Sequence, residues 1–310
     1  MSLTKVYDAP FKCLNGIINV FKPADMKVSH VKVAILHNIT KDLNDMILRE
    51  PRTCENQHLM LESGGAQRPV LRKISSFSDH ELAVGPRYQI QDIRCSPVAT
   101  LGTYTSGVLL FGINKGLKKS SQIQRNRLIR VYHVTGCLGT ATETCFHNSR
   151  ITVRAKYRHV HPERITALAS SMQASHQRKM FELCGVDLQS QAAYEIACKG
   201  LIRPADKSQA VIYGIKLIDF QLPSFTLEIH AINETEEYLA TLIHEMGIEL
   251  RTVAHCLTIR CIRHGHFSVN DALLRHAWNL KGVLHNMRVQ KNVLIEHPYL
   301  LEQQNISLQT

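Results

Sequence analysis

In this 310-residue chain, two runs of basic side chains have types and a spacing that suggest phosphate binding. They are Lys115, Lys118, Lys119, Arg125 and Arg127, and then Arg154, Lys156 and Arg158. Basic groups gathered on one face bind phosphates whatever the base sequence. The chain has 37 basic and 26 acidic residues, a formal net charge of +11. This balance favours a nucleic-acid partner, although basic runs also occur on ordinary solvated surfaces.

Histidine and cysteine do not form a pattern typical of a metal site. The motifs His159-x-His161 and His264-x-His266 would each place two imidazoles on one face of a strand. A third ligand is not evident, and neighbouring arginines would oppose a cation. The nine cysteines are scattered without a Cys-x-x-Cys pair, so they indicate neither a zinc site nor a disulfide framework. We expect no bound metal and reduced cysteines.

Five further motifs follow one another along the chain. They are residues 16–23 (Gly-Ile-Ile-Asn-Val-Phe-Lys-Pro) with His30; residues 99–110 (Ala-Thr-Leu-Gly-Thr-Tyr-Thr-Ser-Gly-Val-Leu-Leu); residues 130–142 (Arg-Val-Tyr, then Leu-Gly-x-x-Thr); residues 193–204 (Ala-Tyr-Glu-Ile-Ala-Cys-Lys-Gly, then Pro); and residues 237–267 (Glu-Tyr-Leu-Ala, Glu-Met-Gly, Ile-Arg and Gly-x-Phe). In content and order they resemble the TruB family of RNA pseudouridine synthases.

The resemblance implies a fold and a reaction. The fold is α/β (α+β), with a mixed, mainly antiparallel sheet and flanking helices. In the family a uridine extruded from structured RNA stacks on an aromatic ring. An aspartate then acts on the nucleotide, and a carbon–carbon glycosidic bond replaces the carbon–nitrogen bond without any cofactor. The expected partners are a stem-loop RNA with an unpaired uridine and RNA-processing proteins, with no membrane.

The resemblance also assigns RNA-binding roles to six residues. The stacking tyrosine of the family corresponds to Tyr132, the second pocket tyrosine corresponds to Tyr238, and Arg130 replaces a lysine. The remaining three would contact RNA or brace the loops around it: Lys22, His30 and Arg260. The alternative for the tyrosines is a place in the core, and the alternative for Arg130 is a solvated charge at the end of a strand.

Two positions depart from the family where catalysis is concerned. The family's catalytic aspartate is Gly102 here, and the arginine that pairs with it is Ala240. Glycine has no side chain that could attack a sugar, and a buried arginine without its carboxylate would be costly. We therefore predict an RNA-binding pseudo-synthase with impaired catalysis. The alternatives are an active synthase with a relocated carboxylate, for which Asp79, Asp92 and Glu143 lie nearest in sequence, and a protein-interaction module that has lost RNA.

The elements that must position these residues alternate between strands and helices. Apolar periodicity predicts strands near 16–21, 107–113, 131–138, 150–157, 211–220, 225–231 and 256–263, and helices near 28–48, 163–183 and 236–246. Thr235 is expected to cap the third helix, which would stop at Gly247. Ser268 with Asp271 would cap a final helix.

The domain organisation expected from the sequence is simple. Residues 1–280 form one TruB-like domain with an inserted loop at 50–90, and residues 281–310 form a C-terminal extension too short for the PUA RNA-binding domain of bacterial TruB enzymes. No apolar run reaches the roughly 18 residues of a membrane helix. A mitochondrial location follows from resemblance alone: the long insertion and the wording of residues 193–204 resemble the animal mitochondrial branch of the family.

Overall fold

One mixed sheet of eight strands carries the segments that the sequence singled out. The computed structural model describes residues 9–46, 53–61, 67–75, 85–183, 185–187, 189–198 and 209–301. Across the sheet the order is β1 (Gly16–Lys22), β5 (Thr105–Ile113), β11 (Ala254–His264), β6 (Arg130–Leu138), β10 (Ser224–Ile232) and β9 (Val211–Gln221). Two short strands extend it, β4 (Cys95–Pro97) beside β5 and β12 (Phe267–Ser268) beside β11. Among the strand pairs of the described residues, only β5 and β11 run parallel, so the predicted fold class is confirmed.

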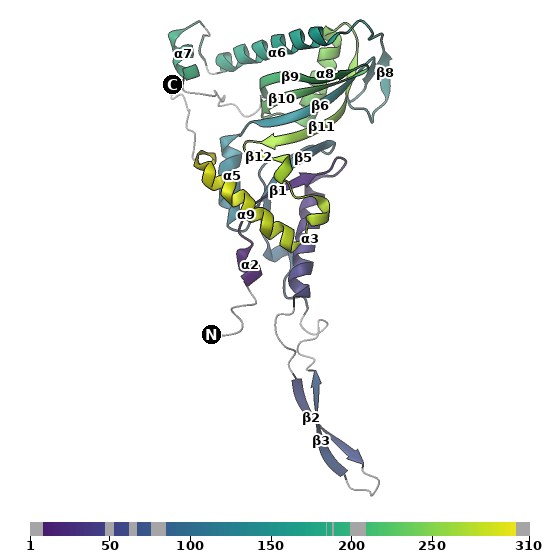
Figure 1. The fold of residues 1–310 in the computed structure, drawn as a ribbon, viewed down its shortest axis with the longest axis vertical. Helices are drawn as coiled ribbons and strands as arrows, with labels where there is room; N and C mark the ends of the chain where they lie inside the picture. Colours follow the sequence, from purple (N-terminus) through teal and green to yellow (C-terminus); the bar gives the residue numbers. More distant parts are fainter. Residues whose placement is uncertain are drawn as a thin grey trace.

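Helices cover the two ends of the sheet (Figure 1). At the β9 end lies α6 (Pro162–Leu183), which contacts β9, whereas α8 (Glu236–Glu249) packs on the central strand β11. At the β1 end, α5 (Gly116–Asn126) and α9 (Leu280–Glu296) pack on β1, and α3 (Val28–Asp45) packs against α9. The remaining short elements are α2 (Ala9–Cys13), α7 (Gln191–Cys198), β7 (Thr140–Thr142) and β8 (Ile151–Arg154). Within the described residues no helix is long and apolar enough to cross a membrane.

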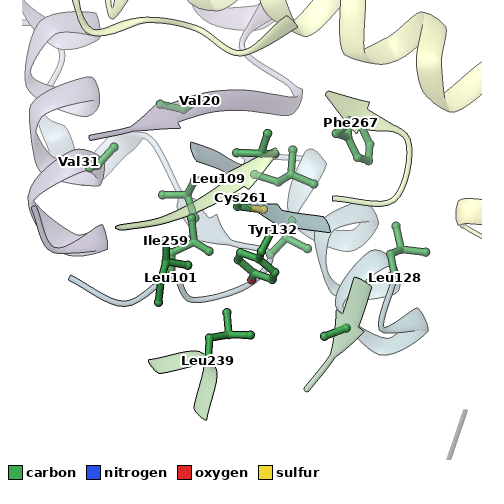
Figure 2. Packing of buried hydrophobic residues seen from close by; sticks show 14 of the residues in the cluster. Val20, Val31, Leu101, Leu109, Leu128, Tyr132, Leu239, Ile259, Cys261 and Phe267 are labelled. Carbon is green, nitrogen blue, oxygen red and sulfur yellow. The ribbon is translucent and has the colours of Figure 1, made fainter. Parts of the chain in front are cut away.

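The centre of the sheet contains an apolar strand with glycines at positions 107 and 112. Strand β5 is buried almost throughout, as expected for a strand covered on both faces. Its Gly107 has φ +113°, and a β-carbon there would lie 2.0 Å from the carbonyl oxygen of Cys261 on β11. Only glycine allows this close crossing. The surrounding core continues to Tyr132, whose ring lies among Leu101, Leu239 and Cys261 in Figure 2.

The structure corrects part of the inserted loop expected at 50–90. The structure has two strands there, β2 (Thr53–Leu61) and β3 (Gln67–Ser75), paired antiparallel from Thr53–Ser75 to Leu61–Gln67. Figure 1 shows this hairpin projecting away from the sheet beyond α3. The polar composition and Gly64-Gly65 indicated a loop. A glycine pair between two extended segments is, however, equally typical of the turn of a hairpin. Asp79 lies outside the described residues.

The helix ends show two further differences. Thr235 caps α8 as predicted, because its hydroxyl accepts from the Tyr238 N–H at 3.2 Å, but α8 continues past Gly247 to Glu249. Ser268, the last residue of β12, caps only a 3₁₀ turn, Val269–Asp271, in which Asp271 lies. The final helix is α9, capped by Asn279, whose side chain accepts from the Gly282 N–H at 2.7 Å.

The segment predicted as a C-terminal extension begins with α9, which packs on β1. Asn286 in this helix accepts from the backbone N–H of Asn19 at 2.8 Å and donates to the carbonyl of Asp271 at 2.8 Å. Both contacts are buried or partly buried. Residues 280–296 are therefore part of the layer that supports β1.

Gly247 provides a test of how closely α8 approaches β11. A β-carbon at Gly247 would lie 2.5 Å from the backbone nitrogen of Ala254. Gly247→Ala adds about 1 kcal/mol of helix propensity, but overpacking costs about 1–3 kcal/mol, so we expect a net loss of stability in urea denaturation. In the control Gly214→Ala, the nearest atom to the new β-carbon is 3.9 Å away, and stability should stay the same or rise. Equal stability of Gly247→Ala and wild type would contradict the packing described.

Candidate active site

The segment 99–105 forms a loop between β4 and β5 beside a cavity of about 240 Å³, which we call the loop cavity. The loop, β6 and the start of α8 contribute its walls. Its lining includes Thr100, Leu101, Gly102, Thr105, Tyr132, Glu234 and Glu236. Drug-sized ligands usually take about 300–1,000 Å³, so this cavity has the scale of a smaller group such as one nucleobase.

Lys22, at the end of β1, fixes the far side of the loop. Its side chain is fully buried, and Nζ donates to the carbonyls of Thr105 at 2.7 Å, Thr103 at 3.0 Å and Pro23 at 3.1 Å. Burial lowers the pKa of Lys22 to about 8. At neutral pH the ammonium therefore remains largely charged. Of the two predicted roles, bracing of the loop agrees with these contacts.

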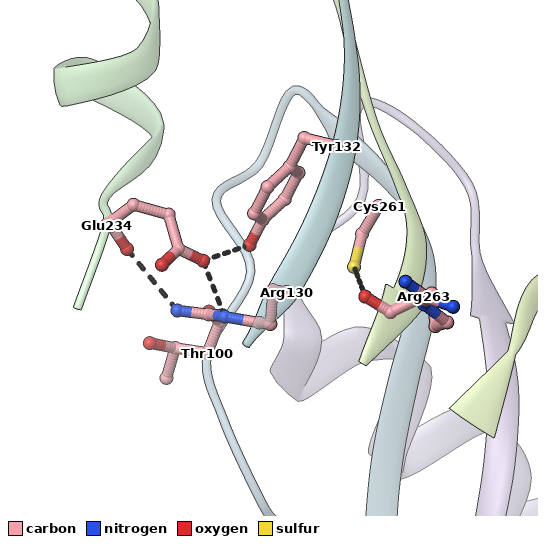
Figure 3. Close-up of polar contacts among 6 residues, drawn as sticks. All are labelled: Thr100, Arg130, Tyr132, Glu234, Cys261 and Arg263. Atoms are coloured by element: carbon pink, nitrogen blue, oxygen red, sulfur yellow. Dashed lines mark hydrogen bonds and ion pairs between the residues drawn. The ribbon is translucent and has the colours of Figure 1, made fainter. Parts of the chain in front are cut away.

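Arg130, Tyr132 and Glu234 form a buried polar network at the base of the loop cavity (Figure 3). Nε of Arg130 and the hydroxyl of Tyr132 both donate to Oε1 of Glu234, each at 2.5 Å. The guanidinium also donates to the carbonyls of Thr100 at 3.3 Å and Glu234 at 3.4 Å. The side chains of Arg130 and Glu234 are 12% and 1% exposed. Burial raises the pKa of Glu234 and holds the pKa of Tyr132 well above its usual value.

These contacts change the interpretation of two predicted RNA-binding residues. Arg130 was expected to contact RNA, yet its guanidinium is used inside the protein, because a buried carboxylate requires a cation. The ring of Tyr132 lines the loop cavity but is only 2% exposed. Its stacking role stays a prediction that requires access to the ring.

Glu236, at the start of α8, was not among the predicted residues. Its Oε2 accepts from the Thr105 N–H at 2.6 Å and from the Thr105 hydroxyl at 2.7 Å. A β-carbon on Gly102 would lie 2.2 Å from both Cδ and Oε2 of Glu236. The carboxylate thus occupies the space that a side chain at position 102 would take. The hydrogen bonds join Glu236 to Thr105, which lies 131 positions away in the sequence. No local spacing in the sequence indicates such a contact.

The three other predicted residues lie outside the loop cavity. Tyr238 is half-buried, its hydroxyl lies 3.2 Å from Nε2 of His176 on α6, and it is not in the lining of the loop cavity, so its role in an RNA pocket stays a prediction. Burial raises the pKa of Tyr238 to about 12. His30 is exposed in the first turn of α3, and Arg260 is exposed on β11 with its guanidinium 5.4 Å from the ring centre of Phe21. Their contacts with RNA stay predictions.

A second cavity of about 400 Å³, the basic cavity, shares Thr100 with the first. Its walls include Arg127, Arg130 and residues near the end of α5. Three exposed basic residues follow α5 towards it: Lys118, Lys119 and Arg125. The predicted phosphate-binding run therefore lies on the helix whose end lines the basic cavity.

The histidine pairs do not have the predicted geometry. His159 and His161 lie in the turn that precedes α6, and His266 lies in the turn after β11 rather than in a strand. His264 is buried, and burial lowers its pKa to about 3. In the part of the chain that the structure describes, no three His, Cys, Asp or Glu residues form a group that could hold a metal ion.

Comparison with known proteins identifies the family. Residues 93–236 match the model described as TruB family pseudouridylate synthase (N terminal domain). The chain is 33% identical over 287 residues to "Pseudouridylate synthase TRUB2, mitochondrial" of Xenopus tropicalis, covering 90% of this chain and 87% of that protein. It is 32% identical to the Homo sapiens protein of the same name, covering 87% and 82%. It is 25% identical to "tRNA pseudouridine synthase B" of Geobacter sulfurreducens, covering 69% and 72%.

Among solved structures, an archaeal box H/ACA sRNP Nop10–Cbf5 complex contains a chain that matches 94% of this one with a TM-score of 0.47 and 14% identity, and the match spans 60% of that chain. The sequence relatives decide the assignment: the chain belongs to the TruB family of pseudouridine synthases. The mitochondrial location expected from the sequence is confirmed by these relatives.

Arg130→Met tests the buried network. At neutral pH the variant leaves the Glu234 carboxylate without its cation, which typically costs about 3–5 kcal/mol. Loss of the cation raises the pKa of Glu234 further, so the folded variant binds a proton that the unfolded chain has released. The stability deficit should therefore be small at low pH and grow as pH rises above the ordinary carboxyl range.

Thermal unfolding of wild type and variant between pH 4 and pH 8 measures this dependence. The double variant Arg130→Met/Glu234→Gln is the matched control, because it removes the stranded charge and should recover part of the loss at neutral pH. A deficit that does not change with pH would contradict a buried ion pair.

Proposed function

We propose that this TruB-family protein binds structured RNA and takes an unpaired uridine into the loop cavity. The observation that carries the proposal is the cavity itself, which is formed by the family's site segment and shares Thr100 with the basic cavity at the end of α5. Basic side chains on α5 supply phosphate contacts, which position RNA without reading its sequence. The polar walls at Thr105, Tyr132 and Glu236 would recognise the nucleotide that enters.

Extrusion of a base from RNA costs a few kcal/mol and is least costly for a base that is already unpaired. A loop uridine is therefore a better ligand for the cavity than a paired one. tRNA, mRNA and mitochondrial rRNA all contain such uridines in stem-loops, and RNA-processing proteins remain proposed partners.

Whether the bound uridine is isomerised depends on a carboxylate that reaches it. Taken by themselves, Gly102 and Ala240, which replace the family's aspartate and arginine, favour the impaired pseudo-synthase. The relocated carboxylates that the sequence offered do not support the alternative. Asp92 is exposed and its Oδ2 accepts from the Gln89 N–H at 2.8 Å, while Glu143 is exposed after β7, and neither lines the loop cavity.

The binding proposal is tested with a stem-loop RNA that carries unpaired loop uridines and with a fully paired duplex of the same length. Wild-type protein should bind the stem-loop more tightly, with an affinity that falls steeply as salt rises. The triple variant Lys118→Ala/Lys119→Ala/Arg125→Ala should bind more weakly. Removing one charge that binds a phosphate lowers the salt slope by about 0.7–0.9, so the slope should be about 2 lower if all three residues bind phosphates.

The matched control is Lys281→Ala/Arg288→Ala/Lys291→Ala. It removes the same number of exposed charges from α9, none of whose residues line either cavity. Equal losses of affinity in the two triple variants would show that net charge, rather than the α5 surface, determines affinity. An affinity of the wild type that does not depend on salt would exclude the RNA-binding proposal and favour the protein-interaction module.

A further inference from the structure

The side chain of Glu236 lies over Gly102. It can keep this position only if residue 102 has no side chain. A β-carbon on Gly102 would lie 2.5 Å from the β-carbon of Glu236 and 2.2 Å from its carboxylate carbon. Real β-carbons do not approach other atoms this closely, so any side chain at 102 would displace Glu236. The φ angle of Gly102 is not in the left-handed region. Space rather than backbone conformation therefore explains the glycine.

The two carboxylate oxygens of Glu236 have different environments. Oε2 is fixed by the N–H and hydroxyl of Thr105, a residue that is itself 2% exposed. Among the described residues, Oε1 has no hydrogen-bond partner. The side chain is partly exposed and lines the loop cavity. One oxygen is thus held rigidly while the other is available to a ligand, which is the arrangement that a preorganised reactive group needs.

Positive charge lies behind the Glu236 carboxylate. The Lys22 ammonium donates to the carbonyl of Thr105, whose N–H and hydroxyl donate to Glu236. Glu236 also lies in the first turn of α8, where the helix dipole stabilises a negative charge. Ala240 follows one turn later, on the same face of α8, and is fully buried in the core. Lys22 on β1 therefore lies near the Glu236 carboxylate, whereas the arginine that the family has at position 240 is missing.

We propose that Glu236 provides the carboxylate that isomerises uridine in this protein, so that the family's reaction is performed from α8 instead of from position 102. The proposal rests on the proposed uridine site. In the reaction, Oε1 bonds to C1′ while the N1–C1′ bond breaks and its electron pair passes to the base. The base turns, C5 bonds to C1′, and the carboxylate leaves with its electron pair. C5 then loses a proton to solvent and N1 gains one, so the product is an isomer of the substrate.

Apart from the exposed Glu237, which no described residue holds by a hydrogen bond, Glu234 is the other carboxylate that lines the loop cavity, and its environment suits a different role. Its side chain is 1% exposed, and Oε1 already accepts from Arg130 and Tyr132. A carboxylate in this network is shielded by its cation and is not accessible to a sugar. Glu234 is a positioning residue that holds the wall of the cavity, and of these two carboxylates Glu236 is the one that combines access with a fixed geometry.

The first experiment uses Glu236→Gln. Glutamine retains an oxygen that accepts from Thr105, so the fold should persist, but it is neither an effective nucleophile nor charged. Purified chain is incubated with total RNA from cells that lack the protein, and pseudouridine is measured by mass spectrometry after digestion to nucleosides. Wild type should form pseudouridine, and Glu236→Gln should form it roughly 100-fold more slowly or not at all. Its affinity for the stem-loop RNA should be unchanged or higher.

The matched control is Glu249→Gln, an exposed carboxylate on the same helix that lines neither cavity. It makes the same change of charge and should retain wild-type turnover. Equal losses of turnover in Glu249→Gln and Glu236→Gln would mean that the charge of α8, and not the reacting group, was measured, which would overturn the proposal.

Gly102→Ala tests the same inference without changing a charge. The added methyl group would displace the Glu236 carboxylate, so turnover should fall about as far as in Glu236→Gln while RNA affinity persists. Gly102→Ala/Glu236→Gln should then be no slower than Glu236→Gln alone, because both changes remove one function. Additive effects on turnover would show that the two positions act independently.

The outcomes separate this proposal from the proposed function. Turnover that survives in Glu236→Gln overturns the role of Glu236. A wild-type protein that binds the stem-loop but forms no pseudouridine in total RNA also overturns it and leaves an RNA-binding pseudo-synthase. A wild-type protein that forms no pseudouridine and binds no RNA contradicts the proposed function itself.

Discussion

The loop at residues 100–105 depends on three charged side chains that reach it from three different elements. Lys22 on β1 binds the carbonyls of Thr103 and Thr105, Arg130 on β6 binds the carbonyl of Thr100, and Glu236 on α8 binds the N–H of Thr105. Backbone groups of a buried loop have no strand or helix to pair with, and unpaired ones cost about 1–3 kcal/mol each. The sheet, α8 and the loop are thereby joined at one place, and the loop cavity lies there.

The sequence predicted the elements that apolar periodicity determines. The run in β5 and the spacing of Val31, Ile35 and Ile39 in α3 indicate burial directly, because strands and helices place their side chains with periods of two and 3.6 residues. Features without that periodicity are not visible in the same way. The polar hairpin has the composition of a loop, and the Asn279 cap of α9 is no more conspicuous in the sequence than Ser268 with Asp271. Local patterns describe a segment and not the partner on which it packs.

The candidate site was predictable to the same extent. The motifs placed the segment 99–110 and Tyr132 at a common site, and the structure brings them together around the loop cavity. The same motifs gave Tyr238 to that cavity, whereas its hydroxyl faces His176. The place of Glu236 in the site could not be predicted from the sequence, because a glutamate after a capping threonine is typical of the first turn of any helix. Its meaning arises only when folding places it against Gly102.

A missing catalytic residue indicates lost catalysis only if the volume it leaves stays empty or becomes apolar. Here that volume contains another carboxylate, and the two arrangements exclude each other. An aspartate at 102 would have its β-carbon 2.2 Å from the Glu236 carboxylate, an overlap that the present position of Glu236 does not allow. An arginine at 240 is likewise difficult to combine with this packing, since Ala240 is fully buried among core side chains. Gly102, Ala240 and Glu236 therefore form one self-consistent set, in which the glycine is a condition for the carboxylate rather than evidence of its loss.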